Sequence, residues 1–188
     1  MDYSKSQQLK NYISPLLSAL RDFSERSVRI QIEKILVPEC LIKMCFPFGE
    51  IKGLEGYFDT IYKPLLKAFP NLERRDLIVL AGETPEESDW VACMGNYFGT
   101  FISPFLEILP TGHLTHMRFH EFYRFENEKV IEIQIIWDLP ELMMQSNSWP
   151  MAPQLGRFIC TPGPISNDCL LYTSPSPRDV EECRMPSC

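Results

Sequence analysis

The stretch that decides the fold is HMRFHEFYRFENEKVIEIQIIWD, residues 116–138. Aromatic and β-branched residues dominate it, and the polar tetrapeptide 126–129 interrupts it, which is typical of a long β-hairpin. A two-residue loop at Asn127-Glu128 places Glu126 opposite Lys129 and sets the register of all other pairs. The predicted pairs are Phe125 with Val130, Tyr123 with Glu132, Glu121 with Gln134, Phe119 with Ile136, and Met117 with Asp138.

Because side chains alternate along a strand, this register puts these ten residues on one face of the sheet. The face is mostly apolar but carries Glu121, Glu132, Gln134 and Asp138, which favours a pocket wall over a plain core. Arg118, Phe122, Ile133 and Trp137 fall on the opposite face. His116 and His120 fall there too, away from Asp138, and a surface or dimer-interface role is expected for them. His113 lies in the preceding loop and is not placed.

Composition restricts the class of protein. A chain of 188 residues predicts one domain with its own core. The net charge of −7 and the pI near 5.0 argue against a nucleic-acid partner. No apolar run approaches the ~20 residues of a membrane span, and the polar N-terminus lacks a signal-peptide layout, so a cytoplasmic location is expected. Seven cysteines without metal-ligand spacing predict reduced thiols and no metal site.

The rest of the chain predicts an α+β fold, in which N-terminal helices pack on one face of a curved antiparallel sheet and form a cone with a cavity. The expected domain is 1–150, followed by a Pro/Gly-rich extension at 151–167 and a disordered, non-native tail at 168–188. Helices are expected at 5–24, 25–36, 53–69 (bent at Pro64) and 139–145, strands at 41–46, 76–81 and 90–101, and a loop at 102–112.

The chain resembles the SnoaL-like polyketide cyclases of the nuclear transport factor 2-like superfamily. The resemblance covers roughly residues 10–167 and is carried by AFPNLERRDLIVLAGE (68–83), DWVACMGNYFGTF (89–101), LPTGHLTHMRFHEFYRFENEKVIEI (109–133) and WDLPELMMQ (137–145). It implies a cone that is often dimeric, with a pocket on the concave face of the sheet. It also implies cofactor-free closure of polyketide esters by an intramolecular aldol step, with an aspartate at the end of the last strand as general acid/base. Asp138 matches that aspartate.

This chemistry suits the predicted wall, since an apolar setting raises the pKa of a carboxyl group towards the working range of an acid/base catalyst. Met117, Phe119 and Ile136 would surround Asp138, and Asn96 or Gln134 could stabilise an enolate oxygen. A small apolar carbonyl compound is therefore the expected substrate. The residues predicted to bind it are Trp90, Asn96, Met117, Phe119, Glu121, Tyr123, Glu132, Gln134 and Ile136.

Two alternatives stay open. Asp138 is followed by Leu-Pro-Glu-Leu and also suits an ordinary helix N-cap. Many relatives carry His where this chain has Asn96, which favours a second class: a non-catalytic domain of the same fold that binds a small hydrophobic ligand or dimerises. The enzyme hypothesis predicts that Asp138 lies inside the cavity and is at least partly desolvated. An interaction protein predicts a filled cavity and an exposed apolar patch, around Phe122, Ile133 and Trp137.

Overall fold

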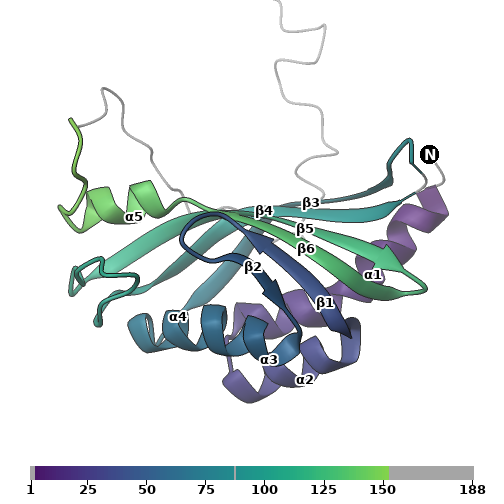
Figure 1. Cartoon of the computed structure of the whole chain (residues 1–188), viewed down its shortest axis with the longest axis horizontal. Coiled ribbons are helices and arrows are strands. Elements are labelled where there is room, and N and C mark those ends of the chain that lie inside the picture. Colours follow the sequence, from purple (N-terminus) through teal and green to yellow (C-terminus); the bar gives the residue numbers. More distant parts are fainter. Residues whose placement is uncertain (1–2, 87, 153–188) are drawn as a thin grey trace, which may run out of the picture.

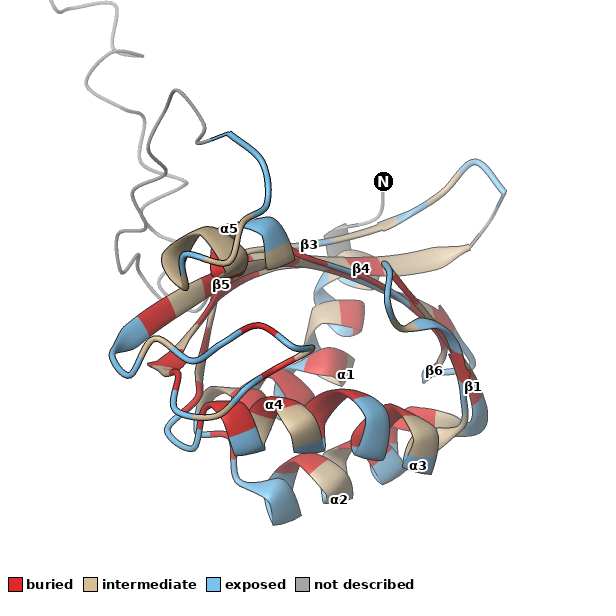
Figure 2. Ribbon diagram, turned by 60° about the vertical axis from the view of Figure 1, so that its left-hand side comes forward, coloured by how far each residue is buried: buried red, intermediate tan, exposed pale blue. Residues whose placement is uncertain are grey.

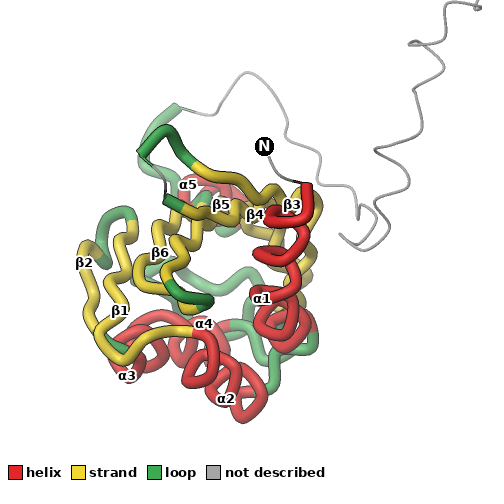
Figure 3. The backbone as a smooth tube through the Cα atoms, turned by 90° about the vertical axis from the view of Figure 1, so that its right-hand side faces the viewer, coloured by secondary structure: helices red, strands yellow, loops and turns green. Residues whose placement is uncertain are grey.

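The computed structural model describes residues 3–86 and 88–152, so the predicted extension, apart from Met151 and Ala152, and the predicted tail lie outside the described residues. A curved, open, six-stranded sheet covers a layer of helices, and the helices α1 to α4 lie under its concave side (Figure 1). The short helix α5 lies on the other side (Figure 3), at the end of the sheet away from the N-terminus (Figure 1). The predicted α+β class with N-terminal helices under a curved sheet is confirmed.

The first two helices follow the predicted apolar spacing. Helix α1 spans Tyr3–Arg21 and buries one stripe that includes Ile13 and Leu16. Helix α2 spans Glu25–Ile35, and the Ser24 hydroxyl accepts a hydrogen bond from the backbone N–H of Ser27 at its start. Both helices therefore place an apolar face against the concave side of the sheet.

The third predicted helix is divided into three segments. Helix α3 (Leu54–Tyr57) passes through a π-helical segment (Phe58–Tyr62) into α4 (Lys63–Ala68). Pro64 lies just after the wider segment, where its ring would otherwise meet the preceding turn. The predicted bend at Pro64 thus takes the form of a π-helical segment.

The sheet has the strand order β2-β1-β6-β5-β4-β3. Strands β1 and β6 pair in parallel, whereas the other neighbours are antiparallel, so the expected wholly antiparallel sheet is not observed. The short edge strand β2 was not predicted. The strand bounds are Leu36–Met44 for β1, Gly49–Lys52 for β2, Glu73–Glu83 for β3, Asp89–Thr100 for β4, Leu114–Glu126 for β5 and Lys129–Trp137 for β6.

The central hairpin forms with the predicted two-residue turn, and its register changes after two predicted pairs, the second of which is Phe125 with Val130. Glu126 lies opposite Lys129 as predicted, and both turn residues have positive φ, 48° at Asn127 and 64° at Glu128. A β-bulge at Ile131 then shifts the pairing, so that Tyr123 faces Ile133 rather than Glu132. The other predicted pairs beyond the bulge, Glu121 with Gln134, Phe119 with Ile136 and Met117 with Asp138, are wrong.

The apolar pattern of β6 explains the bulge. Without it, the even-numbered residues after Val130 would face the core, and these include Glu132 and Gln134. With it, the more apolar set points inward, and Ile133, Ile135 and Trp137 are all buried. Burial of that set outweighs the register that the turn imposes.

The core lies between the concave face of the sheet and the helices (Figure 2). Cys40 and Cys93 are buried in it as free thiols, and Cys45 is also free. Burial raises the pKa of Cys40 to about 12, and the negative charge of Glu132 adds to this. Within residues 3–86 and 88–152, no group of His, Cys, Asp or Glu is arranged to hold a metal ion. None of the described helices is long and apolar enough to cross a membrane.

Candidate functional site

Polar side chains from four strands meet on the inner face of the sheet. We call this set the inner cluster; it is almost completely buried. Strand β3 contributes to it through two residues of the same parity, β4 and β6 through one each, and β5 through two. Its members are Arg74, Asp76, Tyr97, Glu121, Tyr123 and Trp137.

Glu121 is the centre of the inner cluster, and both of its carboxylate oxygens are engaged. Oε2 accepts hydrogen bonds from Arg74 Nη1 at 2.5 Å and from the Tyr123 hydroxyl at 2.6 Å. Oε1 accepts from the Tyr97 hydroxyl at 3.0 Å and from Trp137 Nε1 at 3.3 Å. A carboxylate has about four acceptor positions, so the four donors account for its capacity.

Arg74 connects the two carboxylates of the inner cluster. Its Nε and Nη2 both donate to Asp76, with a shortest distance of 2.8 Å. Its Nη1 also donates to the Tyr97 hydroxyl at 3.1 Å, and its guanidinium lies 4.0 Å from the centre of the Phe119 ring. A guanidinium can present its donors in this forked way to several acceptors at once, which a lysine could not.

The protonation states of the inner cluster follow from these contacts. Burial alone would raise the pKa of Glu121, but the charge of Arg74 and the donated hydrogen bonds outweigh it and lower that pKa. Burial first, and then the charge of Glu121, raise the pKa values of Tyr97 and Tyr123 well above their usual value. Glu121 is therefore an ionised acceptor among neutral tyrosine donors, and it is a weak base.

Aromatic rings from two loops pack against Trp137 of the inner cluster. Phe48, from the β1–β2 turn, lies 6.1 Å from Trp137 between ring centres, and Phe105, from the β4–β5 loop, lies 6.3 Å from it. On the helix side, the hydroxyls of Tyr57 and Tyr62 bind each other at 2.9 Å. Among the cavities lined by described residues, those beside α1, beside α5 and beside the β5–β6 turn contain no member of the inner cluster.

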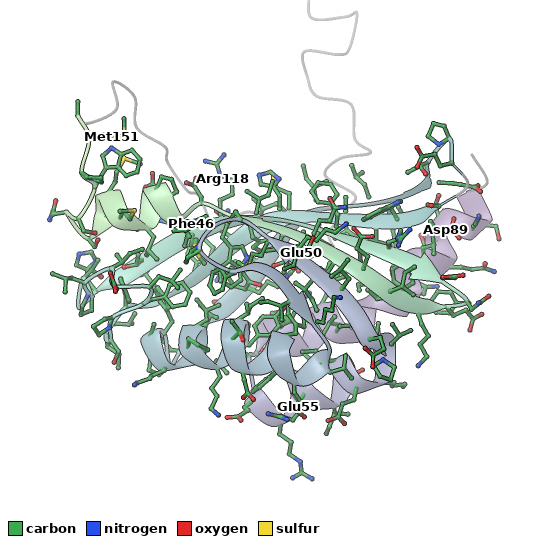
Figure 4. All side chains as sticks on the ribbon, in the orientation of Figure 1. Phe46, Glu50, Glu55, Asp89, Arg118 and Met151 are labelled. Carbon is green, nitrogen blue, oxygen red and sulfur yellow. The ribbon has the colours of Figure 1, made fainter. Side chains whose placement is uncertain are left out.

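Asp138 lies outside this cluster, on the convex side of the sheet. Its Oδ1 accepts a hydrogen bond from the backbone N–H of Glu141 at 3.2 Å, so it is the N-cap of α5 (Leu139–Gln145). Its Oδ2 lies 3.9 Å from Arg118 Nη2, and both side chains are 33% exposed. Figure 4 shows Arg118 pointing away from the helices. The predicted position of Asp138 inside the cone is wrong, and its catalytic role stays a prediction.

The other predicted site residues divide between the two faces. The structure brings Met117, Phe119, Glu121 and Tyr123 together on the inner face, where all four are buried. The bulge places Glu132, Gln134 and Ile136 on the outer face, and strand alternation places Trp90 and Asn96 there too. The predicted single wall is therefore wrong in its β6 half.

Asn96 and the histidines also differ from the predicted arrangement. Asn96 lies between Arg75 and Arg118 in the register, and its buried Oδ1 has no hydrogen-bond partner among the described residues. His116 is on the same outer side as Asp138, so the prediction that it faces away is wrong. Burial lowers the pKa of His116, and the opposing effect of Asp138 is smaller.

Arg74 and Asp76 are functional candidates that the sequence reasoning missed. The signal was weak, because β3 begins with four consecutive charged residues, 73–76, and strand alternation alone puts Arg74 and Asp76 on the same face. Trp137 was expected on the outer face, and the structure buries it with Tyr97 in the inner cluster.

An apolar patch occupies the outer face of the sheet. Leu80, Phe122 and Ile136 are 61%, 37% and 57% exposed. Leu80 and Phe122 lie on the same row of the sheet, with Ala92 between them, and His120 of the next row pairs with Ile136. Phe122 was predicted for such a patch. Ile133 and Trp137 were predicted with it and are buried instead, because of the bulge.

A curved sheet over N-terminal helices is the fold of the nuclear transport factor 2-like class of domains. The chain belongs to the SnoaL-like polyketide cyclase family, whose model matches residues 15–146. No protein of curated function matches it in sequence.

Similar solved structures support the fold. AclR, a candidate hydroxylase from Streptomyces galilaeus, is 20% identical with a TM-score of 0.64, covering 80% of this chain and 91% of that chain. A candidate SnoaL-like polyketide cyclase from Jannaschia sp. CCS1 is 20% identical with a TM-score of 0.64, covering 80% and 99%. IdmH, a candidate polyketide cyclase from Streptomyces antibioticus, is 18% identical with a TM-score of 0.60, covering 74% and 99%. At these identities the likeness concerns the fold alone.

Proposed function

We propose that this chain is an association domain of the SnoaL-like family, in which the inner cluster stabilises the fold and the outer face of the sheet binds a second copy. The observation that carries the proposal is the state of Glu121, which is fully buried and already accepts four hydrogen bonds. A substrate carbonyl would have to displace those donors and the aromatic rings that cover them. In this proposal, the inner cluster has a structural role in this chain and not a catalytic one.

The outer face of the sheet has the features expected of a surface that binds a second copy. Among the described elements, α5 alone lies on that side, and it covers one end of the sheet (Figure 3). The exposed patch consists of Leu80 on the edge strand β3, Phe122 on β5 and Ile136 on β6. Large apolar side chains gathered on one exposed surface are typical of an interface, and an aromatic anchor such as Phe122 is a common centre of binding energy.

The charges of the outer face also suit self-association. Lys43 and Arg124 both contact Glu132, at 2.8 and 3.0 Å. Arg75 binds Glu73 at 2.7 Å. Cations and acids on this face therefore largely cancel, although the whole chain carries a net charge of −7. Two copies could bring these faces together without the repulsion expected of the rest of the surface.

The test is the mass in solution of the variant Leu80→Glu/Phe122→Glu, measured by light scattering after size exclusion. We expect the wild type to be a dimer and the variant a monomer with an unchanged circular dichroism spectrum. Ile102→Glu is the matched control, since Ile102 is exposed but lies outside the patch; it should remain a dimer. A wild-type monomer, or a variant that stays dimeric, would refute the proposal.

The second candidate function is the cofactor-free acid/base chemistry of the family's name, acting on a small apolar carbonyl compound. The specific observation in its favour is that Asp138, although outside the cone, lines a cavity of about 370 Å³ with apolar side chains such as Met144 and Trp149. The test is deuterium exchange next to the carbonyl of 2-tetralone, followed by NMR in D2O. Catalysis lost in Asp138→Asn, which keeps a capping oxygen, would support this function; a rate equal to that of buffer would exclude it for this probe.

A further inference from the structure

His120 lies within the apolar part of the outer face of the sheet. The strand register arranges the side chains of this face in rows that cross the strands. Two neighbouring rows are almost wholly apolar; one contains Ile78, Met94, His120 and Ile136, and the next contains Leu80, Ala92, Phe122 and Gln134. His120 is the ionisable member of these eight residues.

A surface that covers the exposed patch must also cover His120. His120 pairs directly with Ile136 across β5 and β6, and Phe122 follows it by two positions on the same face. Side chains in these positions lie within about 7 Å of each other. Because His120 is itself partly exposed, a second copy that contacts Phe122 and Ile136 removes the imidazole from water.

The imidazole of His120 has no hydrogen-bond or ion-pair partner within residues 3–86 and 88–152. The other two histidines differ in this respect. His113 Nδ1 lies 3.1 Å from the Leu114 carbonyl oxygen, and His116 Nε2 lies 3.6 Å from Glu141 Oε1. A proton on His120 would therefore have no carboxylate at ion-pair distance to offset its charge.

Charged side chains border the two apolar rows, and they come from β1, β3, β5, β6 and the N-cap of α5. They are Lys43, Glu73, Arg75, Arg118, Arg124, Glu132 and Asp138. The outer side chains of β4, a strand that the structure describes throughout, are uncharged. Each of the three carboxylates already pairs with an arginine or a lysine, at distances of 2.7 to 3.9 Å. A proton on His120 would add a positive charge that these carboxylates do not balance.

Association through this face favours the neutral form of His120. Moving a charged imidazole from water into an apolar interface costs far more than moving a neutral one. A two-fold interface contains each residue twice, so two His120 side chains enter every dimer. A group that must be neutral in the dimer makes the dissociation constant rise as pH falls, because the separate chains take up the proton more readily.

We infer that association through the outer face is controlled by pH, with His120 as the proton-sensitive group: the dimer forms while His120 is neutral and dissociates in mildly acidic solution. This inference rests on the association proposed above. The net charge of the whole chain predicts the opposite sign, since protons added to a chain of charge −7 reduce the repulsion between copies. The direction of the pH dependence therefore separates His120 from general charge effects.

The test is the dissociation constant of the wild-type dimer, measured by sedimentation equilibrium at pH 7.5 and at pH 5.5. Histidine side chains usually gain their proton between these values, so we expect the constant to rise at least tenfold, with a limit of about a hundredfold for two imidazoles per dimer. Circular dichroism should show the same fold at both pH values, because pH 5.5 lies above the range in which Glu121 is protonated.

The two proposals fail in different ways. A dimer whose dissociation constant rises less than tenfold, or falls, towards pH 5.5 would overturn the inference about His120 and leave the association intact. A single-chain mass at both pH values would refute the association itself.

Variants assign the effect to one side chain. His120→Gln is neutral and should remain a dimer at both pH values, whereas His120→Lys carries a permanent charge and should be a monomer at both. His113→Gln is the matched control, since His113 is exposed in the β4–β5 loop and lies outside the two apolar rows; it should keep the pH dependence of the wild type. A tenfold rise that persists in His120→Gln, or that is absent from His113→Gln, would contradict the inference.

Discussion

Replacing Glu121 with glutamine tests how much the inner cluster contributes to the fold. The change keeps the shape of the side chain but replaces one oxygen with an NH2 group. Oε2 faces Arg74 and Oε1 faces Trp137, and both of these partners can only donate. Whichever way the amide is turned, its NH2 group meets a donor, and Arg74 loses one of its two carboxylates.

The expected cost follows from the burial of the pair. Removing one partner of a buried ion pair costs about 3–5 kcal/mol, because the other charge stays buried and uncompensated. That is a large part of the roughly 5–15 kcal/mol by which a domain is stable. At about 2–4 °C per kcal/mol for a chain of this size, Tm should fall by about 6–20 °C.

The assay is thermal and urea unfolding of Glu121→Gln, followed by circular dichroism. Glu55→Gln is the matched control, because Glu55 binds Arg29 at 3.0 Å on the exposed surface and should contribute less than about 1 kcal/mol. If the free energy of unfolding of Glu121→Gln lies within about 1 kcal/mol of wild type, the structural role given to the inner cluster is wrong.

Three further predictions concern the pH dependence of Glu121, the packing at Gly95 and the contacts of Gln145. The pKa of Glu121 is lowered in the folded state, so its contribution to stability is present above the unfolded value near 4.5 and is lost as pH falls below it; urea titrations between pH 6 and 3 should show a shallower loss for Glu121→Gln than for wild type. A Cβ at Gly95 would lie 2.0 Å from the Arg75 carbonyl oxygen and 2.8 Å from Phe119, so Gly95→Ala should destabilise by about 3 kcal/mol or more in urea unfolding, and an unchanged midpoint would contradict the packing described. Gln145→Ala leaves the His116 N–H and carbonyl without their side-chain partner, so it should cost about 1–3 kcal/mol and speed amide exchange at His116, whereas Gln7→Ala on exposed α1 should do neither.

Much of the fold could be predicted from local patterns in the sequence. The helical spacing of residues 5–36, the bend at Pro64 and the two-residue turn at Asn127-Glu128 each depend on neighbours in the chain. The structure confirms the helices and the turn, and it has a π-helical segment just before Pro64. The parallel pairing of β1 with β6 could not be predicted in the same way, because it joins residues about ninety positions apart.

The candidate site was harder to predict, for two physical reasons. One bulge at Ile131 moved Glu132, Gln134 and Asp138 to the outer face, and its signal was the apolar set Ile133, Ile135 and Trp137 competing with the register of the turn. The inner cluster depends on contacts between distant strands, such as that of Arg74 with Glu121, which no local pattern specifies.

Sedimentation equilibrium of the wild-type chain over a range of concentrations tests the central claim most directly. Association through the outer face of the sheet requires a mass of twice 21.8 kDa at micromolar concentration, falling to 21.8 kDa when Leu80 and Phe122 are both replaced by glutamate. A single-chain mass for the wild type throughout that range would contradict the account.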